Sequence, residues 1–270
     1  MSLPAAVLLG AIQGLTEFLP VSSSAHLILA RAFFGWELPP AFGLAFDVAV
    51  HVGTLAAIMA FFRAEIVAMA RSLPGVFAAR PSPSAQLLRQ IAIGTIPVVI
   101  VALAFSDFIE QVLRTPAVAA GALAFGAVLM LAAERLGPRS LAEDSIGWRE
   151  ALLIGCAQAS ALIPGMSRSG STITIGMFLG LRRDAAARFT FLLAIPAMLA
   201  AAAKETLALV EMPLPPGSAS ILTAGILVSA AVGYVTIKFF LRFLAGHKLD
   251  AFAAYRLLLA GVTVAWLLKH

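Results

Sequence analysis

Two short serine-rich segments hold the residues of this sequence that could do chemistry. The first runs from Glu17 to His26 and contains three consecutive serines at 22–24. Ser23 and His26 lie three residues apart, so they can meet on a helix surface, and a hydroxyl within reach of an imidazole is the minimum nucleophile–base pair. Gln13 lies four residues before Glu17, so the two share a helix face. Glu17 could hold a metal ion or orient a base, or it could serve only as a helix cap.

The second segment, residues 164–172, combines serines, a threonine and an arginine. Gly165 and Gly170 permit close backbone approach. Hydroxyls and backbone N–H groups at a helix start form an anion nest, and the planar fork of Arg168 suits phosphate oxygens. Flanked by apolar residues, Arg168 needs an anion, which is a bound phosphate, Glu17 or a lipid headgroup. The segment is not a P-loop, because it has no Gly-Lys-Ser/Thr.

Together the two segments suit phosphoryl transfer. Arg168 and the nest would balance charge on the transferring group, and Glu17 could hold a divalent cation that bridges phosphate oxygens. Ser23 could attack phosphorus while His26 takes its proton; spacing alone also leaves His26 or a metal-activated water open as the nucleophile. We assign catalysis to Glu17, Ser23, His26 and Arg168, metal binding to Glu17, and substrate binding to Gln13, Ser22, Ser167, Ser169 and Thr172.

Two further groups of charged residues are weaker candidates. Asp47 and His51 lie four apart at the head of an apolar stretch and share a helix face. They could support the site, or they could be a helix-start carboxylate and a buried histidine. Arg182, Arg183 and Asp184 are typical of a cap at the cytoplasmic membrane interface.

Composition indicates an integral membrane protein. Of 270 residues, 61% are hydrophobic and 12% charged, whereas soluble domains carry about 25% charged residues. The net charge of +5 comes from cations in short stretches between apolar runs, so it does not predict nucleic-acid binding. The single cysteine, Cys156, permits no internal disulfide or zinc motif, and its apolar context predicts a small buried side chain.

Six stretches are long and apolar enough to cross a bilayer, which takes about 20 residues. They lie at about 42–63, 87–106, 115–135, 186–204, 219–243 and 251–268, and the third begins with the helix-start pair Thr115-Pro116. Regions 3–30 and 150–181 each break into two runs that are too short to span. This pattern predicts two re-entrant helical hairpins, whose breaks must be buried in protein or line a wet cavity.

The two hairpin regions resemble each other. Their shared pattern is glycine, glutamine, an apolar run to proline, and serines: Gly10, Gln13, Pro20 and Ser22–Ser24 against Gly155, Gln158, Pro164, Ser167 and Ser169. We therefore predict an all-α integral membrane protein with one domain, 1–270. Residues 1–135 and 136–270 would each hold a hairpin and three spans, so the halves form inverted-topology repeats with the site between them near the midplane.

Basic residues predict the orientation. One side of the predicted topology collects Arg63, Arg71, Arg80, Arg135, Arg139, Arg149, Arg182, Arg183, Arg242 and Lys248, and the other collects Arg31, Arg114, Lys204 and Lys269. The arginine-rich side is expected to be cytoplasmic. Both termini and the mouth of the first hairpin then face outside.

The motifs resemble those of a known family. Gln13 and Glu17 fit (Glu/Gln)-x-x-x-Glu, residues 17–26 resemble Glu-Phe-Leu-Pro-(Val/Ile)-Ser-Ser-(Thr/Ser)-(Gly/Ala)-His, and residues 164–172 match Pro-Gly-x-Ser-Arg-Ser-x-x-Thr. These signatures, with the length and the number of spans, resemble the undecaprenyl pyrophosphate phosphatases of the bacitracin resistance protein type.

The resemblance implies a bacterial inner-membrane enzyme that hydrolyses undecaprenyl diphosphate to the monophosphate carrier for peptidoglycan synthesis and confers bacitracin resistance. It implies a site open to the periplasm and dependence on Mg²⁺ or Ca²⁺. The family's essential positions fall on Glu17, Ser23, His26, Ser167, Arg168 and Thr172. Gln13 replaces a glutamate of many members, which removes one negative charge. The expected partners are a polyprenyl diphosphate lipid and membrane lipids, with no nucleic acid, and a homodimer is left open.

The main alternative is a transporter that flips a lipid phosphate without hydrolysing it, because inverted repeats and broken helices are also transporter features. Binding a headgroup needs the cations and the nest but no nucleophile, so the serine, histidine and carboxylate of the first segment favour an enzyme. A purely structural membrane protein poorly explains Glu17 and Arg168 in segments that do not span.

Overall fold

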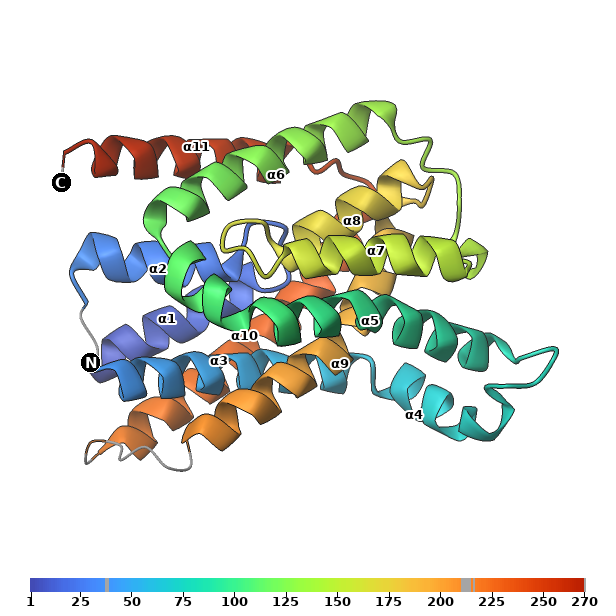
Figure 1. Cartoon of the computed structure of the whole chain (residues 1–270), viewed down its shortest axis with the longest axis horizontal. Helices are drawn as coiled ribbons and strands as arrows, with labels where there is room; N and C mark the ends of the chain where they lie inside the picture. Colours follow the sequence, from blue (N-terminus) through green and yellow to red (C-terminus); the bar gives the residue numbers. More distant parts are fainter. Residues whose placement is uncertain (37–38, 210–214, 216, 270) are drawn as a thin grey trace.

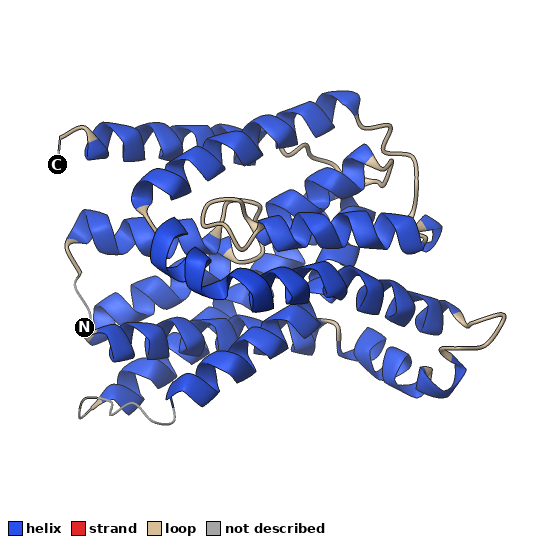
Figure 2. Cartoon of the chain, viewed as in Figure 1, coloured by secondary structure: helices blue, strands red, loops and turns tan. Residues whose placement is uncertain are grey.

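The computed structural model describes residues 1–36, 39–209, 215 and 217–269. The regular secondary structure of this part of the chain is helical apart from one isolated bridge between Leu141 and Leu181, and loops join the helices (Figure 2). Its α-helices are α1 Leu3–Thr16, α2 Ser23–Phe34, α3 Pro40–Phe61, α4 Arg63–Arg71, α5 Pro83–Phe108, α6 Pro116–Leu136, α7 Trp148–Ser160, α8 Arg168–Phe178, α9 Arg183–Leu209, α10 Ser218–Leu244 and α11 Asp250–Leu267. Short 3₁₀ segments lie at Leu73–Gly75 and Glu143–Ser145, and a π turn at Ile109–Leu113 extends α5.

Six of these helices have the length and composition of membrane spans, which confirms the six predicted stretches. They are α3, α5 with its π turn, α6, α9, α10 and α11. The chain is therefore a multi-pass membrane protein. Both termini lie at one end of the molecule, and α4 with the loop that follows it lies at the other (Figure 1).

Local signals set where the spans begin. Ser82 and Thr115 cap α5 and α6, each followed by proline at the first helical position. The Thr115 hydroxyl accepts a hydrogen bond from the Val118 amide at 3.2 Å, which satisfies an amide that has no partner within the helix. The predicted start of the third span at Thr115-Pro116 is confirmed.

The two regions that were predicted not to span are each a pair of short helices. The helices α1, α2, α7 and α8 have 14, 12, 13 and 11 residues, and at about 1.5 Å per residue none crosses a hydrocarbon layer of about 30 Å. Each second helix starts from a serine at positive φ: Ser22 at 74° and Ser167 at 67°. Their hydroxyls cap the helix by accepting from the Ala25 and Gly170 amides.

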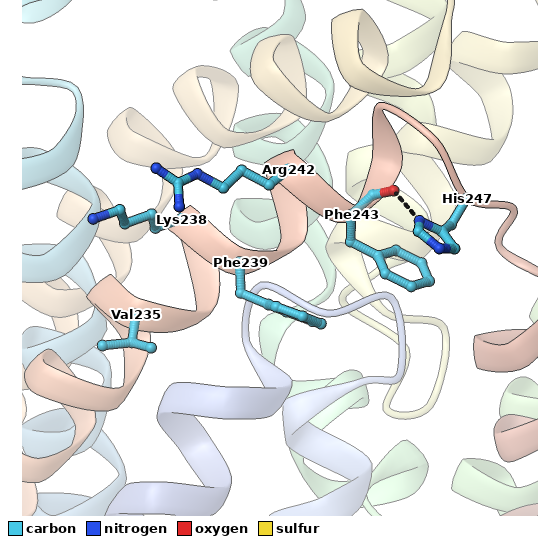
Figure 3. Close-up of a pocket in the computed structure, with 6 residues that line it drawn as sticks. All are labelled: Val235, Lys238, Phe239, Arg242, Phe243 and His247. Carbon is cyan, nitrogen blue, oxygen red and sulfur yellow. Dashed lines mark hydrogen bonds between the residues drawn. The ribbon is translucent and has the colours of Figure 1, made fainter.

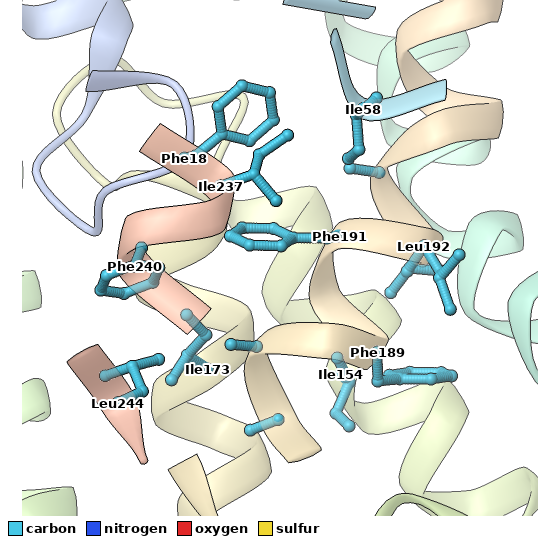
Figure 4. Packing of buried hydrophobic residues seen from close by; sticks show 14 of the residues in the cluster. Phe18, Ile58, Ile154, Ile173, Phe189, Phe191, Leu192, Ile237, Phe240 and Leu244 are labelled. Carbon is cyan, nitrogen blue, oxygen red and sulfur yellow. The ribbon is translucent and has the colours of Figure 1, made fainter. Parts of the chain in front are cut away.

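The turns that join these helix pairs meet in the middle of the molecule (Figure 2). A hydrogen bond from the Ser169 hydroxyl to the Leu19 carbonyl, 2.9 Å, ties one turn to the other. Buried aromatic residues pack beneath them (Figure 4). The ring of Phe18 packs edge-on against Phe191 with 5.5 Å between centroids, which anchors the backbone next to Glu17.

Cys156 and the charged group Arg182, Arg183 and Asp184 lie outside the central turns. Cys156 is exposed on α7, so the prediction of a buried cysteine is wrong: it lies one turn after the exposed Leu153, and an apolar context cannot tell a lipid-facing surface from a core. At the end opposite the termini, Arg182 pairs with Asp184 at 3.0 Å on the surface, while Arg183 pairs with the buried carboxylate of Glu134.

Candidate active site

Glu17 and Arg168 form an ion pair that joins the two predicted segments across 151 positions of sequence. Glu17 Oε1 accepts from Arg168 Nη2, and the two side chains are 6% and 19% exposed. Glu17 lies in the turn after α1, and Arg168 is the first residue of α8. Glu17 is one of the three anions that the sequence left open as the partner of Arg168. It places a carboxylate and a guanidinium in one half-buried cluster.

The second carboxylate oxygen of Glu17 gathers three more groups. Ser23 Oγ donates to Oε2 at 2.5 Å and Gln13 Nε2 donates to it at 2.8 Å, which confirms that Gln13 and Glu17 share a face. His51 Nε2 lies 3.9 Å from the same oxygen. The Nδ1 atom of His51 is 2.7 Å from the Asp47 carbonyl, so the ring is oriented by its own helix. His51 therefore lies beside the Glu17 carboxylate, and its supporting role stays a prediction.

Asp47 itself faces other partners. Its carboxylate accepts from both terminal nitrogens of Arg31 and lies 3.6 Å from Arg114. These contacts tie α2 and the segment before α6 to the head of α3. Of the pair Asp47 and His51, only the histidine side chain reaches Glu17.

His26 has partners other than Ser23. Its Nδ1 is 2.7 Å from the Ser22 carbonyl, and its Nε2 is 2.7 Å from the Tyr255 hydroxyl of α11. The hydroxyl of Ser23 is instead given to Glu17. Helical spacing places Ser23 and His26 on neighbouring positions of α2. Glu17, in the preceding turn, is the nearer acceptor for the Ser23 hydroxyl, and the imidazole of His26 is held by the backbone carbonyl of Ser22 instead.

The hydroxyls of the predicted anion nest hydrogen-bond mainly to neighbouring groups of the protein. Ser167 Oγ accepts from the Gly170 amide at 3.1 Å and lies 3.3 Å from Ser169 Oγ. Thr172 Oγ1 donates to the Arg168 carbonyl at 2.7 Å and accepts from Thr190 at 2.9 Å. Ser167, Ser169 and Thr172 are all buried, so these hydroxyls hold Arg168 and the helix start in place.

Arg256 of α11 is a residue that the sequence reasoning missed. It is 0% exposed and makes five hydrogen bonds, all to backbone carbonyls: those of Pro20, Ala122, Leu123, Gly165 and Met166. These acceptors belong to both turns and to α6. The signal was present, because an arginine inside a predicted span is expensive unless it has a partner.

The residues around Glu17 do not form a complete metal site. Within the described ranges, no group of three or more His, Cys, Asp or Glu side chains could hold an ion. A hard cation such as Mg²⁺ takes about six oxygen ligands, and both oxygens of Glu17 already accept from Arg168, Ser23 and Gln13. A divalent cation at Glu17 would have to compete with Arg168, so the residues present do not fit the expected metal ion.

A surface hollow lies elsewhere, on α10. It is lined by Val235, Lys238, Phe239, Arg242, Phe243 and His247, none of which belongs to the cluster around Glu17 (Figure 3). The hollow contains no carboxylate and no serine, so it offers none of the groups that phosphoryl transfer needs.

Comparison with known proteins agrees with the geometry. The model of the family described as bacitracin resistance protein BacA matches residues 6–262. Undecaprenyl-diphosphatase of Rubrobacter xylanophilus is 43% identical over 270 residues, covering 97% of both chains. Undecaprenyl-diphosphatase 2 of Stutzerimonas stutzeri is 46% identical with the same coverage, and undecaprenyl-diphosphatase of Alcanivorax borkumensis is 45% identical, covering 97% of this chain and 98% of its own. This chain belongs to the bacitracin resistance protein BacA family.

Proposed function

We propose that this protein is a membrane phosphatase that hydrolyses undecaprenyl diphosphate to undecaprenyl phosphate and phosphate. The observation that carries the proposal is the cluster in which Glu17 binds both the Ser23 hydroxyl and Arg168. It joins a nucleophile, a base and an anion-binding cation, and the relatives are named undecaprenyl-diphosphatases. The reaction would return the lipid carrier to peptidoglycan synthesis and confer bacitracin resistance by removing the diphosphate.

The short hydrogen bond favours Ser23 as the nucleophile and Glu17 as its base. Ser23 Oγ attacks the terminal phosphorus, its proton passes to Glu17, and the bridging P–O bond breaks with its electron pair on undecaprenyl phosphate. Water then cleaves the phosphoserine, which releases phosphate and restores Ser23. In this second step the proton held by Glu17 returns to the departing Ser23 Oγ, and the proton of the attacking water leaves with the phosphate. The net reaction therefore consumes one water and restores both Ser23 and the Glu17 carboxylate.

Positive charge around the cluster suits a diphosphate. Arg168 is the more exposed partner of its ion pair, so phosphate oxygens can compete with Glu17 for its fork. Within the described residues Arg256 hydrogen-bonds only to backbone carbonyls and pairs with no carboxylate, so it brings an uncompensated positive charge to the two turns. Such fixed charges act strongly in a site from which water is excluded.

We further propose that the helix pairs α1–α2 and α7–α8 are re-entrant hairpins of two inverted repeats, 1–135 and 136–270. Four residues recur 145 positions later as the same type: Gly10, Gln13, Ser22 and Ser24, at Gly155, Gln158, Ser167 and Ser169. Ser22 and Ser167 share the positive φ and the capping role. Figure 1 supports the inversion, since α1 runs away from the end that holds the termini and α7 runs toward it.

The location follows from charge. The loops after α4 and α6 lie at the end opposite the termini (Figure 1), and this end carries most of the arginines of the predicted cytoplasmic side. We place the chain in the bacterial cytoplasmic membrane with its termini outside and its site open to the outer face. Cysteine labelling from outside intact cells at residues 2 and 80, in variants that lack Cys156, tests this orientation.

Phosphate release is the direct test. Purified wild-type protein is given a polyprenyl diphosphate in detergent, with and without EDTA, beside Arg168→Ala and the exposed control Arg71→Ala. We expect the wild type and the control to release one phosphate per lipid and Arg168→Ala to release almost none. An inactive wild type across lipids and cations would contradict the proposal and favour lipid-phosphate transport, which vesicles loaded with labelled lipid would measure.

A further inference from the structure

Tyr255 of α11 contacts His26, one of the predicted site residues, across 229 positions of sequence. Its hydroxyl lies 2.7 Å from His26 Nε2. The two rings are nearly parallel, with an interplanar angle of 8° and 5.6 Å between centroids. This tyrosine lies outside both serine-rich segments, among the apolar residues of the last span.

The contacts of His26 fix which ring nitrogen carries the proton. The Ser22 carbonyl can only accept, so Nδ1, at 2.7 Å, must donate and carries the hydrogen. In the neutral ring Nε2 then holds the lone pair, and the Tyr255 hydroxyl donates to it. The basic nitrogen of His26 is therefore Nε2, held in direction by the phenol.

The backbone of Tyr255 is itself firmly placed. The next residue, Arg256, is buried and bound to carbonyls of both turns and of α6. Tyr255 itself, in contrast, is 43% exposed, so it does not belong to the buried core. The contact that the fold fixes at Tyr255 is therefore the hydrogen bond between its hydroxyl and His26.

We propose that Tyr255 is a positioning residue of the phosphatase. Its hydroxyl holds the His26 ring so that the Nε2 lone pair keeps one direction, and this hydrogen bond is released when the diphosphate binds. This inference rests on the proposed function and deepens it, because it assigns the orientation of His26 to the second half of the chain. Two hydrogen bonds, one at each ring nitrogen, leave the imidazole no freedom to turn.

The test uses the two tyrosines of the chain as a matched pair. Tyr255→Phe removes the hydroxyl and keeps the ring, Tyr255→Leu removes both, and Tyr234→Phe is the control, since the Tyr234 ring packs on Phe61 away from His26. We expect kcat on a polyprenyl diphosphate to fall about tenfold in both Tyr255 variants, which is less than the roughly 10²–10⁴-fold that a group transferring the proton itself contributes, because Tyr255 only orients His26. KM should change less than threefold, and the Tyr234 control should match the wild type.

A spectroscopic measurement separates this inference from the proposed function. With only four histidines, ¹⁵N-labelled protein gives few imidazole signals, and His26→Gln identifies the one from His26. We expect Nε2 of His26 to shift in Tyr255→Phe and not in Tyr234→Phe, as a nitrogen that loses a donor does. An inactive wild type would overturn the proposed phosphatase activity, and the ¹⁵N signal of His26 would still test its contact with Tyr255. An unshifted signal, or full kcat in Tyr255→Phe with loss only in Tyr255→Leu, would overturn the inference.

Discussion

The hydroxyl of Ser23 donates to the carboxylate of Glu17 over 2.5 Å, across the turn that joins α1 to α2. The same carboxylate binds Arg168 from the other half of the chain. In the proposed mechanism, Glu17 is thus both the proton acceptor of the nucleophile Ser23 and the partner of Arg168, the cation for the phosphate. Removing Glu17 would uncouple these two groups, whereas removing either partner leaves the other in place.

Loss of the Ser23 hydroxyl should stop turnover at the chemical step. We expect Ser23→Ala to bind the diphosphate but release no phosphate above background, and Glu17→Gln to lose about 10²–10⁴ in kcat because the base is gone. Acid quenching with lipid labelled at the terminal phosphorus should trap a phosphoprotein in the wild type and not in Ser23→Ala.

The control for this experiment is Ser220→Ala, an exposed serine in the first turn of α10 that bonds only to its own helix start. It should behave as the wild type. Turnover by Ser23→Ala at more than a tenth of the wild-type rate would instead indicate attack by water or by His26.

Arg168 should prove sensitive to shape as well as charge. Arg168→Lys keeps the charge but loses the fork that suits phosphate oxygens, so we expect kcat/KM to fall about 10²–10³-fold, as for loss of one oxyanion donor. Arg168→Met should also lower thermal stability, because it leaves buried Glu17 unpaired, which costs about 3–5 kcal/mol for a buried pair. The double variant Glu17→Gln, Arg168→Met should regain most of that stability, and equal Tm values for the single and double variants would contradict the pairing.

Local sequence patterns predicted the elements well and the contacts between them less well. Apolar length predicted the spans, and the proline and serines near Pro20 predicted the first break, because both signals act over a few residues. Helical spacing compares neighbours within one helix, so it predicts a contact between Ser23 and His26. The observed partner of Ser23 is Glu17, which lies in the turn before that helix. Tyr255 could not be found this way, since its partner is 229 positions distant.

Gln13 should control how strongly the enzyme depends on metal ions. Its amide donates to Glu17 Oε2 at 2.8 Å, so Gln13→Glu would place two carboxylates against each other. Such like charges repel unless a proton or a cation lies between them. We expect Gln13→Glu to need Mg²⁺ or Ca²⁺ for activity at neutral pH and to lose it in EDTA, with the wild type changing less. Phosphate release against free cation concentration measures this, and parallel curves for the two proteins would exclude it.

Arg256 should set the distance between the two turns. Its guanidinium is bound by the carbonyls of Pro20, Gly165 and Met166, and a Cβ added at Gly170 would lie 2.6 Å from its Nη1 atom. We therefore expect Gly170→Ala to push the guanidinium off these carbonyls and to lower both kcat and thermal stability. Gly261→Ala, on α11 itself with nothing within 4 Å of the new Cβ, is the matched control and should keep both. Arg256→Lys keeps a charge but cannot reach five carbonyls at once, so its Tm should fall while leaving some activity. If Gly170→Ala matched Gly261→Ala in both measurements, the turns would be held by other contacts, and Arg256 would serve α6 alone.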